Sequence, residues 1–229
     1  MVTSYSEAKT IVFRYSVDKP LKLVNPGYGW KVEVKDDLSE LSGGPLEGIY
    51  KLEQFHCHWG CTNDKGSEHT VDGRTFAGEL HLVHWNCTKY ATFAEAAKFS
   101  DGLAVLAIFL KVGEKHNELE KVASLLPHVL FRDDSIEFQG SIDPARLFPK
   151  AKGYWTYQGS LTTPPCTENV TWIIFKEPIE VSNNQLILFR NLRCHKKDEN
   201  LSSSEGLIVN NYRPPLPLGN RELRECGSL

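Results

Sequence analysis

Three histidines on two predicted strands have the residue type and spacing of a metal site. His56 and His58 lie two residues apart in an alternating run, so in a strand both side chains point to one face. In the next run, residues 79–84, His81 and His84 point to opposite faces, so only His81 is expected to join the pair. Three imidazoles without a cysteine form an open site, in which zinc keeps its fourth position for water. The pattern therefore predicts that zinc, or another divalent metal, makes a water molecule nucleophilic at neutral pH.

Polar side chains accompany these histidines in both runs. Gln54 and Glu79 stand two positions before His56 and His81, so they are expected on the same faces. A ligand histidine needs a partner on its other ring nitrogen to fix its tautomer and orientation, and these two residues can supply it. The alternative is that His56 and His58 are ordinary packing or surface residues, as a single such pair on a strand usually is. The other histidines are expected in structural or exposed positions: His69, His84, His116, His128 and His195.

The first third of the chain consists of short apolar or alternating runs separated by turn residues, which is typical of strands. A polar loop, residues 60–77, separates the two histidine runs and is long enough to let them pair as antiparallel neighbours. Two longer apolar runs, Leu103–Val112 and Val170–Phe175, suit central strands buried on both faces. The expected early strands are Ile11–Tyr15, Leu21–Val24, Trp30–Val34, Ile49–His58 and Phe76–Trp85.

Helices are expected to be few, short and peripheral. Each begins where a side-chain oxygen can cap free backbone N–H groups, three residues before a glutamate or glutamine. The second is expected to end at Pro127 and the third near Leu192. The three expected starts are Thr92 with Glu95, Asn117 with Glu120, and Ser182 with Gln185. Together these elements predict one mainly β (α+β) domain over residues 1–229, with short helices around its sheet.

The composition excludes several classes of protein. The 229 residues are 41% hydrophobic and 24% charged, which is enough to bury a core. A net charge of −3 and an isoelectric point near 6.2 leave no excess of lysine and arginine to neutralise nucleic-acid phosphates. No apolar run is long enough to span a bilayer. The six cysteines, without a CxxC pair, build neither a disulfide scaffold nor a structural zinc site. We expect a monomer that binds neither nucleic acid nor membranes.

Around the histidines the sequence strongly resembles the α-class carbonic anhydrases. The matching motifs are Gln54–Gly60, Gly66–Asp72, Glu79–Asn86, Asp101–Val105, Tyr154–Tyr157, Gly159–Pro165 and Asn210–Pro214. The resemblance runs in consistent order from about Tyr5 to the C-terminus. It implies a large, twisted, mostly antiparallel sheet with zinc at the bottom of a conical cavity. It also implies reversible hydration of carbon dioxide to bicarbonate and a proton through zinc-bound hydroxide, with inhibition by sulfonamides.

The resemblance further implies roles for residues that the patterns alone would assign to the core or to loops. Thr162 is expected to accept a hydrogen bond from the zinc-bound hydroxide and to donate its own proton to Glu68. Thr163 is expected to meet bicarbonate, and Asn211 to support the ligand histidines. An apolar wall for carbon dioxide is expected from Val83, Val105, Leu161 and Val170.

Two features depart from the family's pattern. Fast members regenerate hydroxide through a histidine on the cavity rim, and here that position is Tyr28. Because a phenol ordinarily titrates near pH 10, it is a poor shuttle at pH 7, and we predict slow proton transfer that imidazole buffers rescue. Lys31, also on the rim, is a weaker shuttle candidate. Family members usually carry a longer N-terminal segment that covers part of the cavity, so this domain is expected to be N-terminally shortened, at a cost to stability and activity.

Two alternatives to the enzyme remain open at this point. A shortened chain can bind zinc and yet act as a weakly active interaction module, although this one keeps three zinc histidines with Glu68 and Thr162. A zinc esterase or other hydrolase is the other alternative, against which a narrow valine-lined wall argues. Because no signal peptide is visible, we expect a cytoplasmic protein. Tyr28 resembles mitochondrial members, however, and Cys166 falls where secreted members place half of a disulfide.

Overall fold

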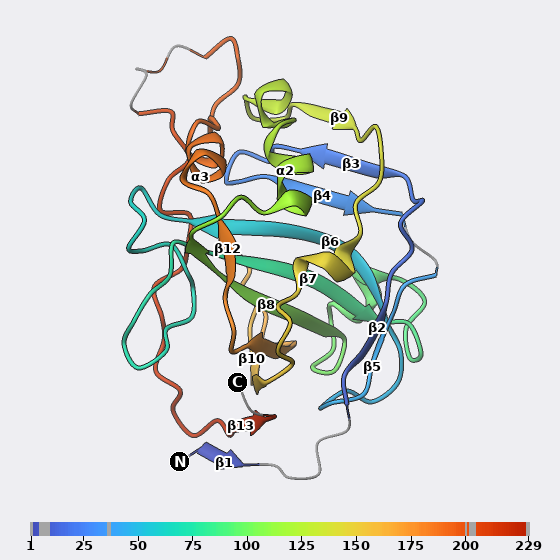
Figure 1. The fold of residues 1–229 in the computed structure, drawn as a ribbon. Coiled ribbons are helices and arrows are strands. Elements are labelled where there is room, and N and C mark those ends of the chain that lie inside the picture. Colours follow the sequence, from blue (N-terminus) through green and yellow to red (C-terminus); the bar gives the residue numbers. More distant parts are fainter. Residues whose placement is uncertain (1, 5–9, 36–37, 200, 202–204, 228–229) are drawn as a thin grey trace.

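The computed structural model describes residues 2–4, 10–35, 38–199, 201 and 205–227. Within them, thirteen strands form one large twisted sheet (Figure 1). Its main path is β1-β13-β10-β11-β8-β7-β6-β4-β3-β9, while β12, β2 and β5 pair off this path. The strands are β1 Val2–Ser4, β2 Val12–Arg14, β3 Leu21–Val24, β4 Lys31–Val34, β5 Glu40–Ser42, β6 Tyr50–Trp59, β7 Gly78–Asn86, β8 Leu103–Val112, β9 Ser135–Glu137, β10 Tyr154–Gly159, β11 Val170–Phe175, β12 Ile179–Val181 and β13 Leu223–Cys226.

Most neighbouring strands are antiparallel, which confirms the predicted fold class. Among the described residues, the parallel pairs are β1 with β13, β8 with β11, and β8 with β12. The long apolar runs form β8 and β11 with the predicted bounds, because strands buried on both faces need apolar side chains at consecutive positions. The five expected early strands appear as β2, β3, β4, β6 and β7, with ends that differ from the predicted ones by no more than two residues.

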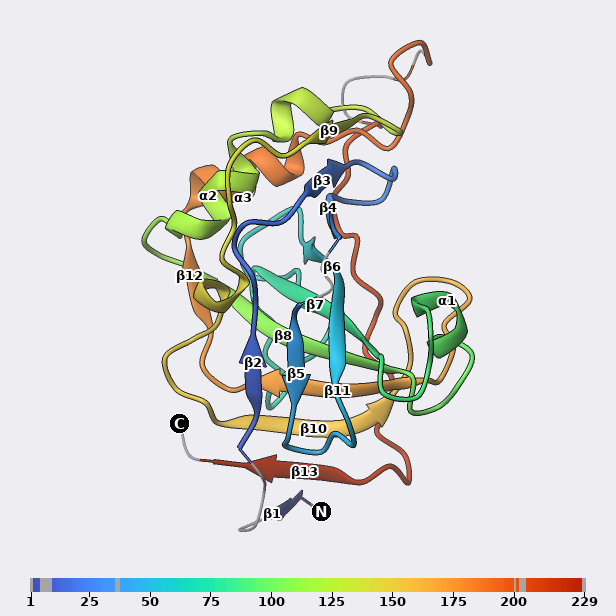
Figure 2. The ribbon, with the colours of Figure 1, turned by 90° about the vertical axis from the view of Figure 1, so that its right-hand side faces the viewer.

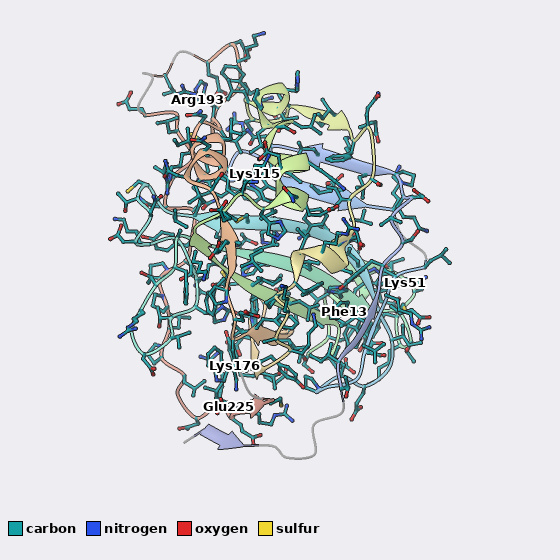
Figure 3. All side chains as sticks on the ribbon, viewed as in Figure 1. Phe13, Lys51, Lys115, Lys176, Arg193 and Glu225 are labelled. Atoms are coloured by element: carbon teal, nitrogen blue, oxygen red, sulfur yellow. The ribbon has the colours of Figure 1, made fainter. Side chains whose placement is uncertain are left out.

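The sequence patterns missed β1, β5, β9, β10, β12 and β13. Most of these strands have only three or four residues, too few to show an alternation. Tertiary contacts hold them in place instead. Lys176, directly after β11, forms an ion pair with Glu225 of β13 (Figure 3), and Lys111 of β8 forms one with Glu180 of β12 at 3.1 Å.

All three expected α-helices form, and two of them begin at the predicted caps. They are α1 Phe93–Ala96, α2 Asn117–Ala123 and α3 Asn183–Arg190, and two 3₁₀ helices, η1 Leu126–Val129 and η2 Pro144–Leu147, lie between β8 and β10. Thr92 caps α1, and Ser182 with Gln185 forms the predicted capping box of α3. The predicted cap of α2 is wrong by one residue. Asn117 is the first helical residue, and the His116 ring caps the helix by accepting a hydrogen bond from the Leu119 N–H at 3.3 Å.

Alternation along the central strands sorts their side chains into two apolar clusters, one on each face of the sheet. Leu82 and Leu106 belong to the larger cluster, which α2 and α3 cover, while Val83 and Val105 belong to the smaller one. Figure 2 shows α2 and α3 on one side of the sheet and α1 on the other. His81 shares the face of the smaller cluster, so this face carries the candidate metal site. Among the described residues, no helix has the length and apolar character that crossing a membrane requires.

Candidate metal centre

Three imidazole rings converge on the face of the sheet that carries the smaller cluster. β6 and β7 are antiparallel neighbours, and their register sets His56 directly opposite His81. His58 follows His56 on the same face of β6. One ring nitrogen from each of the three histidines lies within 4.8 Å of the others, and Nε2 of His56 is 3.2 Å from Nε2 of His58. The structure thus brings together the three residues that the spacing singled out.

The other nitrogen of each ring donates a hydrogen bond to an oxygen behind it. His56 Nδ1 lies 2.8 Å from Gln54 Oε1, and His81 Nε2 lies 2.7 Å from Glu79 Oε1. His58 Nδ1 lies 2.8 Å from the backbone oxygen of Asn211. Carbonyl and carboxylate oxygens only accept hydrogen bonds, so the proton of each neutral ring sits on this outer nitrogen. Three unprotonated nitrogens therefore face one point.

Neutral imidazoles are favoured at this point by their surroundings. Burial lowers the pKa of His56 well below its ordinary value, and the neighbouring His58 and His81 lower it further. Burial likewise lowers the pKa of His58, against the opposing charge of Glu68. Three unprotonated lone pairs that face each other repel unless a cation lies between them. Three nitrogen donors without a thiolate fit zinc in an open tetrahedral site, so the residues present suit the ion that the sequence predicts.

Asn211 supports this centre through its side chain as well as its backbone. Its Oδ1 accepts a hydrogen bond from the Trp59 N–H at 2.8 Å, and its Nδ2 donates to the backbone oxygen of Tyr28 at 2.9 Å. Asn211 therefore ties the loop after residue 205 to the end of β6 and to the turn between β3 and β4. A residue distant in sequence orients the His58 ring in this way.

Glu79 is the hub of a buried network behind the histidines. Its Oε1 accepts hydrogen bonds from His81 and from His69 Nδ1, each at 2.7 Å. Its Oε2 accepts the backbone N–H groups of Glu68 and His69 at 2.9 and 2.8 Å. Burial alone would raise the pKa of Glu79, but the charge and hydrogen bonds of His69 and His81 hold it well below its usual range. The Tyr157 hydroxyl, 2.7 Å from His69 Nε2, extends the network.

His69 is the residue that sequence reasoning missed. It was expected in a merely structural or exposed position, yet it contacts the carboxylate that orients His81. His69, Glu79 and His81 also meet the geometric requirement for a metal site, but Glu79 Oε1 is already shared by the two rings. Its place in the motif Gly66–Asp72, next to Glu68, was the signal that could have revealed it.

Glu68 lies directly beside the histidines with one oxygen unsatisfied. Its Oε1 accepts the backbone N–H of Arg213 at 2.7 Å. Its Oε2 is 3.4 Å from His58 Nε2 and 3.9 Å from His81 Nδ1. This buried oxygen has no hydrogen-bond partner among the described residues. Because an unsatisfied buried carboxylate oxygen costs free energy, it marks a place where a donor belongs.

No hydrogen bond joins Thr162 to Glu68 among the described residues, so the expected bond stays a prediction. Both residues line one pocket, and Thr162 is half-buried in the loop between β10 and β11. Glu68 Oε2 instead lies 3.4 Å from Nε2 of His58. Thr163, the next residue, is exposed.

The residues expected in the apolar wall do gather beside the metal centre. Val83 faces Val105 across β7 and β8, and Val105 in turn faces Trp172 across β8 and β11. Val170 is fully buried in the same cluster, and Leu161 packs against it. The Trp172 ring lies 4.9 Å from the His81 ring, between their centroids. The wall is therefore contiguous with the histidines.

The two residues expected on the rim differ in their side-chain contacts and exposure. Tyr28, in the turn between β3 and β4, is 58% exposed. Lys31 stands opposite His56 in the register of β4 and β6, but its ammonium group forms an ion pair with Glu33 at 2.8 Å. Of the two, only Tyr28 extends freely into water.

Comparison with known proteins agrees with this geometry. The family model of the eukaryotic-type carbonic anhydrases matches residues 2–227. Mouse (Mus musculus) mitochondrial carbonic anhydrase 5B is 47% identical over 218 residues, which cover 94% of this chain and 67% of the relative. Human (Homo sapiens) mitochondrial carbonic anhydrase 5A is 47% identical over 219 residues, 95% of this chain and 70% of the relative. Mouse carbonic anhydrase 7 is 45% identical over 212 residues, 92% of this chain and 78% of the relative. This chain belongs to the eukaryotic-type carbonic anhydrase family.

Proposed function

We propose that this chain catalyses the reversible hydration of carbon dioxide to bicarbonate and a proton, with one zinc ion held by His56, His58 and His81. The observation that carries the proposal is the convergence of three unprotonated imidazole nitrogens, each fixed from behind by an oxygen. Membership of the carbonic anhydrase family supports it. In carbonic anhydrases generally, bound zinc acts as a Lewis acid and lowers the pKa of a water ligand to about 7, a value taken from the family and not from this structure.

The chain's own residues orient this centre. Gln54, Glu79 and the Asn211 carbonyl fix the tautomer of one ring each, so that the nitrogens facing the ion need no rearrangement when it binds. The carboxylate of Glu79 also increases the basicity of the His81 ring through their hydrogen bond. Preorganisation of this kind supports both tight metal binding and a fixed position for the nucleophile.

Glu68 and Thr162 are proposed to direct the nucleophile. The unsatisfied Oε2 of Glu68 is the acceptor that a hydroxyl donor requires, and Thr162 lines the same pocket. Rotation of the Thr162 side chain so that it donates to Glu68 leaves its oxygen free to accept a hydrogen bond from the nucleophile. A nucleophile held in this way has one lone pair free to attack carbon dioxide. Thr163, exposed beside it, is proposed to contact bicarbonate.

The apolar wall is proposed to hold carbon dioxide. Val83, Val105 and Val170 are buried and offer no hydrogen bond, and Leu161 packs against their cluster. A linear nonpolar molecule such as carbon dioxide can lie against such a surface without displacing any polar ligand. The wall also argues for a small substrate and against a bulky ester.

A stopped-flow assay of carbon dioxide hydration tests the proposal. The zinc-loaded protein is expected to be active and to be inhibited by an aromatic sulfonamide, while His81→Ala is expected to lose both zinc and activity. His128→Gln, which changes an exposed histidine, is the matched control and is expected to keep both. Full zinc loading without hydration would favour the interaction module, and turnover of esters alone would favour the hydrolase.

We further infer that residues 1–229 act as one catalytic domain and as a monomer whose ligands are carbon dioxide and bicarbonate. The participation of strands from both ends of the described chain in one sheet supports the single domain. Cytoplasmic localisation, and the expectation that the protein binds neither nucleic acid nor membranes, stay predictions from the sequence.

A further inference from the structure

A pocket of about 360 Å³ lies beside the metal centre on the same face of the sheet. The strand registers form a row in which His81 faces Ala107, Ala107 faces Ile174, and Ile174 faces Trp155. Ile174 and Trp155 line the pocket. At a spacing of roughly 5 Å between strands, the pocket floor begins about 10 Å from His81. Glu68 and Thr162 also line the pocket, so it adjoins the metal centre without including a zinc histidine.

The lining of the pocket is largely apolar. Phe109, Trp155, Tyr157 and Leu223 join Ile174 in it, and they come from four strands of the sheet, β8, β10, β11 and β13. Leu216 and Leu218, from a proline-rich loop, also line the pocket and are 60% and 37% exposed. Apolar side chains exposed at the mouth of a pocket gain free energy when a ligand removes them from water.

Two arginines give the pocket its polar character. Arg221 lies over the Tyr157 ring, 5.2 Å from its centroid, and is fixed by hydrogen bonds to the backbone oxygens of Pro217 and Leu218 at 2.7 and 2.8 Å. Arg213 donates from Nη1 to Ser160 Oγ at 3.3 Å. Within the described part of the chain, neither guanidinium group forms an ion pair with a carboxylate, although Glu68 and Asp72 also line the pocket. Each keeps N–H donors for an anion.

We propose that this pocket binds a small organic carboxylate with an aromatic body. The body would lie against Trp155, Ile174 and Leu223, and the carboxylate would pair with the Nη1 end of the Arg221 guanidinium, which the two backbone oxygens leave free. The volume is that of a site for a small ligand. The inference does not depend on the proposed function, because no zinc histidine contributes to the pocket. An occupant would nevertheless touch Glu68 and Thr162, and so affect the metal centre.

Titration with phenylacetate, followed by the fluorescence of tryptophan and by amide chemical shifts, tests the proposal. We expect saturable binding with a Kd of about 1 mM or tighter, as for a fragment of this size. The uncharged phenylacetamide, which has the same shape, is expected to bind at least about tenfold more weakly, because it forms no charge-assisted pair. Equal binding of the two compounds, or no saturation by phenylacetate, would overturn the proposal.

Variants and a competitor locate the binding. Arg221→Gln and Leu218→Glu are expected to weaken phenylacetate binding about tenfold or more, the second by placing a like charge at the mouth. Arg146→Gln, which changes an exposed arginine outside the pocket, is the control and is expected to change nothing. The titration is repeated with excess benzenesulfonamide and on protein stripped of metal, since carboxylates can also bind zinc. Binding that disappears in either condition, or survives both pocket variants, would place phenylacetate elsewhere and refute the pocket.

Discussion

The metal centre and the neighbouring pocket occupy one face of one sheet, yet they satisfy their polar groups differently. In the centre, each outer imidazole nitrogen has an oxygen partner and each inner nitrogen faces a shared point. In the pocket, neither guanidinium group pairs with a carboxylate among the residues that the structure describes, and leucines face water. The centre is built within long central strands, whose register fixes its geometry. The pocket walls come mainly from loops, and Glu68 Oε2 there has no hydrogen-bond partner within the described ranges. Strand register thus fixes the metal centre, whereas the loops form the pocket in which a ligand can still pair with polar groups.

Removing Glu79, the hub of the network behind the zinc histidines, should have the largest effect, a loss of stability. Glu79→Ala leaves His69, His81 and two backbone N–H groups without their buried acceptor. We expect the free energy of unfolding to fall by about 3–5 kcal/mol, because the substitution breaks a buried network of charged groups. Urea unfolding of the metal-free protein measures this loss. Gln54→Ala removes one partly buried partner of His56 and is the milder comparison, and an equal loss in both variants would contradict the role of Glu79 as hub.

The next largest effect is expected at His84, on the opposite face of β7 from His81. There the free energy of unfolding should depend on pH. His84 is buried, lies 2.8 Å from the Tyr15 hydroxyl, and burial lowers its pKa to about 3. In the unfolded chain this imidazole is therefore protonated below about pH 6.5, whereas in the folded chain it is protonated only below about pH 3. The stabilisation from keeping this ring neutral is fully present above pH 6.5 and is lost as the pH falls towards 3.

His84→Gln tests this dependence. Between pH 6.5 and 3, the free energy of unfolding of the variant should fall less steeply than that of the parent. Urea titrations at a series of pH values measure both slopes, and the exposed His128→Gln serves as the control. Parallel curves for parent and His84→Gln would mean that this ring does not titrate as the buried geometry requires.

Substitutions of Glu68 and Thr162, which line the pocket, should lower turnover more than they weaken zinc binding. Thr162→Val and Glu68→Gln are each expected to lower kcat/KM by about 10²–10³-fold, as for the loss of one preorganised hydrogen bond at a reacting centre. If they act as a unit, the double variant should be little worse than either single one. Stopped-flow kinetics and zinc content measure the two effects separately. Thr162→Ser keeps the hydroxyl and should retain most activity, whereas additive losses would contradict a shared role.

The smallest effect is expected at the rim. Tyr28→His places a group that titrates near neutrality where an exposed phenol now lies. In weakly buffered solution it should raise kcat about tenfold, because proton transfer to solvent limits the parent. Imidazole buffer should reduce the difference by serving the parent as an external shuttle. An unchanged rate in weak buffer would show that another step is limiting.

The sequence predicted the centre better than its surroundings, for a physical reason. Alternation with a period of two residues placed His56, His58 and His81 on one face and His84 on the other, because strand geometry is local. Contacts between distant segments are not local. The acceptor for His58 is a backbone oxygen of Asn211, 153 residues away, and His69 reaches Glu79 across the folded loop before β7. The orientation of Glu68 depends on such a loop contact, the Arg213 N–H, and its expected bond to Thr162 stays a prediction.

The central claim is that three imidazoles hold one zinc ion that keeps a position for water. X-ray absorption at the zinc edge of protein loaded with one equivalent of zinc tests it most directly. We predict three nitrogen ligands at about 2.0–2.1 Å and one further light atom, with no sulfur. A sulfur ligand, or a count of four protein nitrogens, would contradict the open three-histidine site.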